Sequence, residues 1–167
     1  MKPINVYLIA KIAEEYYERN EALCSRLDER FNVFIPHQHN PYNVPGNQMQ
    51  AEVAQEDFRA IDNSQLALIS PPFGEDCWVE IGYCKGKEIL SVLYVSEDPH
   101  FYGNENWLET WMGKEAIAAV AIENQSLMEI IQQDPILRHK PHHLMESDEG
   151  FSEFLEGLIA REQGEVQ

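Results

Sequence analysis

The stretch Leu66-Ala67-Leu68-Ile69-Ser70-Pro71-Pro72-Phe73-Gly74, with the segments that follow it, determines the predicted fold. Its first five residues form a short apolar run that predicts a buried strand, and its last four predict a turn. A helix is expected to begin at Asp76 or Cys77 and to end near Lys85. The apolar segment 89–95 predicts the next strand. This region therefore has the order strand, helix, strand.

The same alternation continues on both sides of this unit. Further strands are predicted at residues 4–10, 31–35 and 116–122, and further helices at 13–30, 49–63, 126–133 and 151–162. Residues 37–48 are expected to form a long loop, and residues 96–114 a polar and aromatic loop with a helical turn near 107–111. Strands that alternate with helices predict a mostly parallel, five-stranded sheet covered on both faces. We expect one α/β domain over residues 1–167, with a frayed tail from about 162.

The amino-acid composition predicts the cellular compartment of the protein. The chain has no run of about 18 apolar residues and no amino-terminal signal peptide, so a membrane span is not expected. Its three cysteines cannot all pair within one chain and are interpreted as free thiols. A cytoplasmic protein is predicted.

The net charge of the chain limits the classes of binding partner that are expected. The net charge of −17, from 29 acidic and 12 basic residues, repels polyanions, so nucleic acid is not an expected partner. A few local donors can still hold a small anionic ligand, and the acidity also fits simple solubility.

Candidate binding residues follow the predicted strands, because ligands of parallel sheets bind at the carboxyl ends of the strands. Ala10 and Lys11 end the first strand, His37 follows the second, and Pro71 follows the third. His37 and His39 could stack on and hydrogen-bond a nucleobase. A His-x-His pair can also bind a metal, but no spacing of cysteines or carboxylates completes a metal site, and no metal or cofactor is expected.

Four side chains are candidates for catalysis. Glu80 lies about one turn into the predicted helix, whose amino end should keep its carboxylate ionised and able to attack an anomeric carbon. Asp57 could bind sugar hydroxyls, Asp76 could protonate a departing base, and a Tyr7 hydroxyl could orient Glu80. Each residue also has a simpler interpretation. Glu80 could be an ordinary first-turn glutamate, and Asp57 could lie on a solvated helix face. Asp76 could be a helix N-cap, and Tyr7 could be a core aromatic residue.

The segment Asp76-Cys77-Trp78-Val79-Glu80-Ile81-Gly82-Tyr83-Cys84-Lys85-Gly86-Lys87 resembles the signature of nucleoside 2-deoxyribosyltransferase-like proteins. Val6-Tyr7-Leu8 resembles the first strand of that family with its tyrosine. The segment 55–61, which contains Asp57, resembles its helix with a sugar-binding aspartate. The resemblance covers roughly residues 4–95.

The resemblance implies a flavodoxin-like three-layer sandwich, often as a homo-oligomer, and a nucleoside or nucleotide as the substrate. It also implies a covalent deoxyribosyl intermediate on Glu80, positioned by Tyr7, with nucleobase or water as the acceptor. Three features differ from the family. The gap from Asp76 to Glu80 is about two residues shorter than in the family, which disfavours Asp76 as the general acid. Residues 10–15 replace a Gly- or Ser-containing loop, which disfavours a 5′-phosphate unless Lys11 or Arg19 compensates. A bulky Trp78 beside the nucleophile would reshape the substrate pocket.

Two other functions remain open on this scaffold. The altered segment after the first strand and Trp78 would also suit a non-catalytic module that binds or senses nucleotides. A cytoplasmic interaction protein, whose acidic face meets a basic partner, is the third hypothesis.

Overall fold

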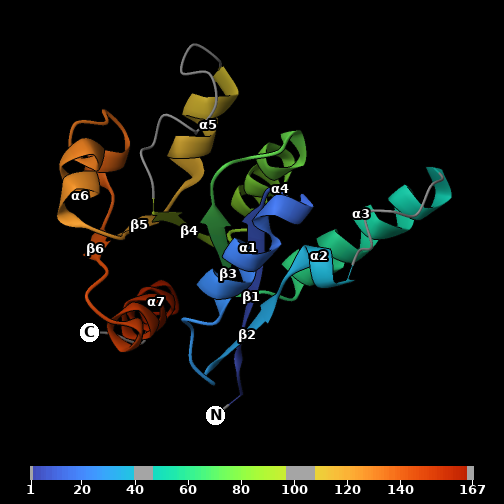
Figure 1. Cartoon of the computed structure of the whole chain (residues 1–167), viewed down its shortest axis with the longest axis horizontal. Coiled ribbons are helices and arrows are strands. Elements are labelled where there is room, and N and C mark those ends of the chain that lie inside the picture. Colours follow the sequence, from blue (N-terminus) through green and yellow to red (C-terminus); the bar gives the residue numbers. More distant parts are fainter. Residues whose placement is uncertain (1, 40–46, 97–107, 165–167) are drawn as a thin grey trace.

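The computed structural model describes residues 2–39, 47–96 and 108–164 (Figure 1). Within these residues, six strands form one parallel sheet in the order β2-β1-β3-β4-β5-β6. The strands are β1 Ile4–Ala10, β2 Phe31–Phe34, β3 Leu66–Ser70, β4 Leu90–Val95, β5 Ala119–Ile122 and β6 His142–Leu144. The predicted α/β class with a flavodoxin-like three-layer arrangement is confirmed, but the sheet has six strands rather than five.

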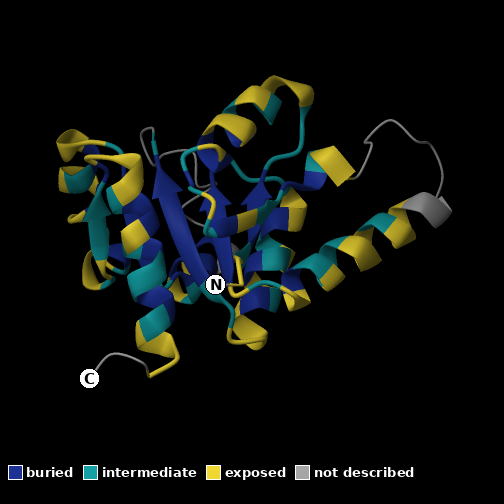
Figure 2. Cartoon of the chain, turned by 90° about the horizontal axis from the view of Figure 1, so that it is seen from below, coloured by how far each residue is buried: buried dark blue, intermediate teal, exposed yellow. Residues whose placement is uncertain are grey.

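Helices cover both faces of this sheet, so that the strands form a buried middle layer (Figure 2). Helices α1 and α7 pack on one face, and α3, α4 and α6 pack on the other. The α-helices are α1 Tyr17–Cys24, α2 Pro36–His39, α3 Asn47–Asp62, α4 Glu75–Gly86, α5 Leu108–Ala116, α6 Gln125–Ile131 and α7 Asp148–Glu162. Short 3-10 turns lie at Glu14–Tyr16 and Leu137–His139.

Successive side chains of a strand point to opposite faces of the sheet, and this alternation determines which helical layer each side chain contacts. In β1, Val6 and Leu8 belong to the core beneath α1 and α7, whereas Tyr7 and Ile9 belong to the core beneath α3 and α4. All four are almost completely buried. Tyr7 therefore lies on the face of β1 that is covered by α3 and α4, the helices that carry Asp57 and Glu80.

Three elements differ from the sequence-based expectation. Strand β6 was not predicted, and residues 37–39 belong to the short helix α2 rather than to a loop. Ala116 ends helix α5, so β5 begins at Ala119, three residues later than expected. The rest of the two predicted loops, at 40–46 and 97–107, lies outside the described residues. Across the described residues, no helix combines the length and apolar character needed to cross a bilayer.

Candidate active site

A tyrosine and a glutamate meet on the face of the sheet covered by α3 and α4. The Tyr7 hydroxyl donates a hydrogen bond to Glu80 Oε1 over 2.6 Å. Burial, followed by the nearby Glu80 carboxyl, raises the pKa of the Tyr7 phenol well above its usual value, so the phenol stays protonated. The structure thus contains the predicted contact between the first-strand phenol and the helix carboxyl.

Helix α4 holds Glu80 with its side chain half-buried. Cys77, Ile81 and Cys84 recur at helical spacing and are fully buried, which anchors α4 on the sheet. Burial raises the pKa of the Glu80 carboxyl from its ordinary 4.5 to about 8, although the hydrogen bond from Tyr7 lowers it. The helix amino end was expected to keep Glu80 ionised, whereas burial of the carboxyl group favours its neutral form.

Two aspartates add negative charge around this carboxyl. Asp57, half-buried on α3, and Asp76, exposed in the first turn of α4, both raise the pKa of Glu80. Asp57 also raises the pKa of Tyr7. Gly74 is the N-cap of α4, so the N-cap interpretation of Asp76 is wrong. Asp76 lies four residues before Glu80, which places both side chains on one side of the helix.

The carboxyl ends of β1 and β3 lie side by side. Ala10 is buried and pairs with Ser70, and the Lys11 amide donates to the Pro72 carbonyl over 3.3 Å. Pro71, also buried, joins Pro72 through a cis peptide bond. The Lys11 ammonium lies 5.2 Å from the centre of the Tyr16 ring. The structure thus brings together Ala10, Lys11 and Pro71, as expected from the parallel sheet.

Trp78 does not lie beside Glu80, in contrast to the expectation from the sequence. Its ring packs edge-on against Phe73, with ring centres 4.9 Å apart, and closely approaches Gly113 of α5. Residues two positions apart in a helix do not face each other. Trp78 therefore anchors α5 on α4, and its predicted contact with the substrate is not supported by its position.

The two predicted base-binding histidines have different environments. His37 stacks on Tyr17, its Nε2 lies 3.0 Å from Glu21 Oε1, and only 3% of its side chain is exposed. It is therefore buried beneath α1 instead of facing a ligand. His39 is exposed and stacks on Phe34, which in turn stacks on Tyr7.

Phe34 is a site residue that the sequence reasoning missed. Its ring lies between His39, at a centroid distance of 4.2 Å, and Tyr7, at 5.6 Å. The sequence did predict a strand at 31–35 that contains Phe34, but the pairing of Phe34 with Tyr7 appears only in the structure. The stack of Tyr7, Phe34 and His39 restrains the phenol that contacts Glu80.

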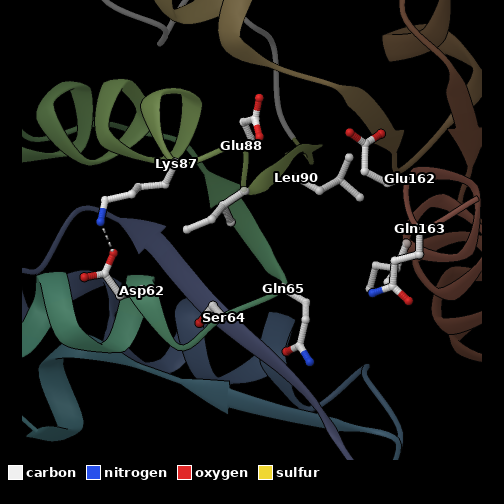
Figure 3. Close-up of a pocket in the computed structure, with 10 residues that line it drawn as sticks. Asp62, Ser64, Gln65, Lys87, Glu88, Leu90, Glu162 and Gln163 are labelled. Atoms are coloured by element: carbon white, nitrogen blue, oxygen red, sulfur yellow. Dashed lines mark ion pairs between the residues drawn. The ribbon is translucent and has the colours of Figure 1, made fainter.

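Other polar clusters lie away from this site. A cavity of about 500 Å³ opens at the amino ends of β3 and β4, where Asp62 faces Lys87 at 2.9 Å (Figure 3). This is the edge of the sheet opposite the expected ligand-binding edge. Within the described part of the chain, no group of three or more His, Cys, Asp or Glu residues is placed to hold a metal ion.

Comparison with known proteins supports the fold. No protein-family description matches the sequence, and no curated protein matches it. A solved 2-deoxyribosyltransferase from Bacillus psychrosaccharolyticus is similar in structure, with a TM-score of 0.56 and 17% identity over 82% of this chain and 98% of that one. A conserved protein from Enterococcus faecalis V583 has a TM-score of 0.52 and 13% identity over 93% of this chain and 98% of that one. At these identities, the likeness establishes the shared fold.

Proposed function

We propose that this chain cleaves or exchanges the N-glycosidic bond of a nucleoside or deoxynucleoside, with Glu80 as the nucleophile. The observation that carries the proposal is the 2.6 Å hydrogen bond from the buried Tyr7 to the half-buried Glu80 carboxyl. Asp57 and Asp76 add two more carboxyl groups near it. The fold shared with a 2-deoxyribosyltransferase supports the same reaction class.

The reaction is a double displacement. In the molecules whose Glu80 is ionised, a carboxylate oxygen forms a bond to C1′ of the sugar while the bond between C1′ and the base nitrogen breaks and its electron pair leaves with the base. Asp76 supplies the proton that the departing base requires, and Asp57 binds the sugar hydroxyls. Water or a second nucleobase then attacks C1′ and passes its proton to the Asp76 carboxylate left by the first step, which releases the Glu80 carboxylate and retains the anomeric configuration.

A trapping experiment tests the role of Glu80. The protein is incubated with a 2-fluoro-2-deoxynucleoside and digested, and peptides are analysed by mass spectrometry. We expect a sugar adduct on Glu80 in the wild type and in Glu129→Gln, a control on the exposed surface of α6. Glu80→Gln should remove the adduct and slow base release at least about a thousandfold, or about 4 kcal/mol of activation free energy. Equal base release by the wild type and Glu80→Ala would rule out this mechanism.

A second candidate function is nucleotide binding without turnover. It is favoured by the raised pKa of Glu80, about 8, because a protonated carboxyl is a poor nucleophile at neutral pH. Calorimetric binding of a nucleotide, with no base released at pH 7 or pH 9, would support this alternative. Base release that increases from pH 7 to pH 9 would support catalysis.

A further inference from the structure

Tyr7 has a large neighbour on one side of it in the sheet and a small neighbour on the other. In the parallel register, it pairs with Phe34 of β2 and with Ala67 of β3. The Phe34 ring lies nearly parallel to the Tyr7 ring, at an angle of 13° and a centroid distance of 5.6 Å. Ala67 contributes only a methyl group. Phe34 is therefore the bulky strand neighbour that limits how far the Tyr7 ring can move toward β2.

The Phe34 ring is itself bordered by open space. It is half-buried and lines a cavity of about 280 Å³ together with Arg59 and Ala60 of α3. A cavity supplies no atoms for the ring to pack against, so another contact has to hold it. His39 supplies this contact, because its ring stacks on Phe34 at a centroid distance of 4.2 Å and an angle of 10°.

A buried residue of the same short helix holds His39 in place. His37 has only 3% of its side chain exposed, stacks on Tyr17 at a centroid distance of 4.1 Å, and has its Nε2 3.0 Å from Glu21 Oε1. Residues two positions apart on a helix do not face each other. With His37 anchored on α1, the exposed His39 is directed to the other side of α2, where it meets Phe34.

The position of the Tyr7 ring matters because of its hydroxyl group. This hydroxyl donates to Glu80 Oε1 over 2.6 Å, and a hydrogen bond weakens when its donor shifts away from the acceptor. A hydrogen bond to a carboxylate stabilises the ionised form of the acid, and this one lowers the pKa of Glu80. A displaced Tyr7 ring would therefore make Glu80 harder to ionise.

We propose that Phe34 is a positioning residue, supported by His39, that keeps the Tyr7 hydroxyl on Glu80 Oε1. The two rings act on Glu80 through Tyr7. Their importance for the reaction rests on the proposed function, because it is the ionised Glu80 that would attack the sugar. The positioning of the hydroxyl does not rest on that function and can be measured without a substrate.

An NMR titration of protein labelled with ¹³C at the glutamate carboxyl groups measures the pKa of Glu80. Its signal is the one that is absent from Glu80→Gln. Phe34→Leu removes the ring but keeps an apolar side chain, and we expect it to raise the pKa of Glu80 by about 0.5 or more. Phe34→Tyr keeps the ring and should preserve the wild-type value. His39→Ala should raise the pKa by a smaller amount.

Two controls separate positioning from general packing. Phe154→Leu removes the ring from a similar pair on the other face of the sheet, where Phe154 stacks on His143 at a centroid distance of 4.7 Å. It should lower Tm about as much as Phe34→Leu does and leave the pKa of Glu80 unchanged. In a Tyr7→Phe background, Phe34→Leu should no longer change this pKa, because the hydroxyl that transmits the effect is absent.

Kinetics provide a second measurement that depends on the proposed function. Phe34→Leu should move the rise of kcat/KM with pH to more alkaline values by the same amount, and the rate at pH 7 should fall about threefold. If the wild type releases no base at any pH, the proposed function fails. The NMR titration still decides whether Phe34 positions Tyr7.

A rise in the pKa of Glu80 in Phe34→Leu that disappears in the Tyr7→Phe background supports the proposal. An unchanged pKa, a lower pKa, or a rise that persists without the Tyr7 hydroxyl overturns it, because Phe34 would then act through packing or access of water. If Phe34→Leu does not fold, the exposed position His39 allows the same test: His39→Ala has to raise the pKa of Glu80, and only when the Tyr7 hydroxyl is present.

Discussion

At the scale of a single residue, two opposing effects act on the pKa of the Glu80 carboxyl. Its enclosure favours the neutral acid, and the hydrogen bond from Tyr7 favours the carboxylate. Each pKa unit corresponds to about 1.4 kcal/mol, so a rise from 4.5 to about 8 means that enclosure dominates. The sequence could place Glu80 and Tyr7 in one site, but it could not show how far packing around α4 removes water from the carboxyl group.

The raised pKa makes stability depend on pH in a defined direction. The folded pKa of Glu80 exceeds the unfolded value of 4.5, so its stabilising contribution is complete below about pH 4.5 and is lost as the pH rises through about 8. Glu80→Gln removes this dependence. We expect the variant to gain about 2 kcal/mol or more over the wild type between pH 5 and pH 9, or about 4–8 °C in Tm. Calorimetric melting at both pH values measures this difference, and an equal difference at the two would contradict enclosure of the carboxyl.

Tyr7→Phe tests how the phenol influences Glu80. Loss of the hydrogen bond that lowers the pKa of Glu80 should raise that pKa further. The rise of kcat/KM with pH should therefore move to more alkaline values, with a rate at pH 7 about 10–100-fold lower. Tyr83→Phe is the matched control, because Tyr83 donates to Asp62 at the opposite edge of the sheet. A lower rate with an unchanged pH profile would limit Tyr7 to a packing role.

At the scale of elements, the buried strands were the most predictable. The boundaries of β1 and β3 agree with the predicted ones because their apolar runs are bounded by polar or turn-forming residues. Strand β6 escaped prediction because it has only three residues, two of them histidines, and its pairing with β5 alone defines it. The packing of the Trp78 ring could not be predicted from the sequence either, because α5 determines where that ring lies.

The contact between α4 and α5 depends on Gly113. A Cβ atom at this position would overlap Cζ3 of the Trp78 ring, so alanine requires the indole ring or α5 to move. We expect Gly113→Ala to lower the free energy of unfolding by about 1–3 kcal/mol, which lowers Tm by roughly 2–12 °C. Thermal melting followed by circular dichroism is the measurement.

A matched glycine and a second variant give this prediction its controls. Gly157 lies inside α7 with no atom within 4 Å of its added Cβ, so Gly157→Ala should instead stabilise by about 0.5–1 kcal/mol. Trp78→Leu combined with Gly113→Ala should be less destabilising than the sum of the two single changes, because the shared clash is gone. Simple additivity would show that Gly113 acts through another contact.

At the scale of the whole molecule, the charge is large and mostly of one sign. With 29 acidic and 12 basic residues, folding brings many carboxylates closer together than they are in the unfolded chain. Several arginines are already paired, as in the contacts of Arg26 with Asp148 and of Arg30 with Glu156. The remaining excess of carboxylates opposes the compact state through repulsion that dissolved ions can screen.

Salt should therefore stabilise this protein. The Debye length falls from about 30 Å at 0.01 M salt to about 8 Å at 0.15 M, which screens repulsion between separate carboxylates more strongly than contacts within ion pairs. We expect NaCl over this range to raise the free energy of unfolding by about 1 kcal/mol, or Tm by about 2–4 °C. Tm is measured at pH 7 in NaCl and in equimolar sucrose. Sucrose is uncharged, so a rise in Tm with NaCl alone reports charge screening and not exclusion of the solute from the protein surface. A Tm that falls with NaCl would mean that ion pairs such as that of Arg26 with Asp148 contribute more than the net repulsion removes.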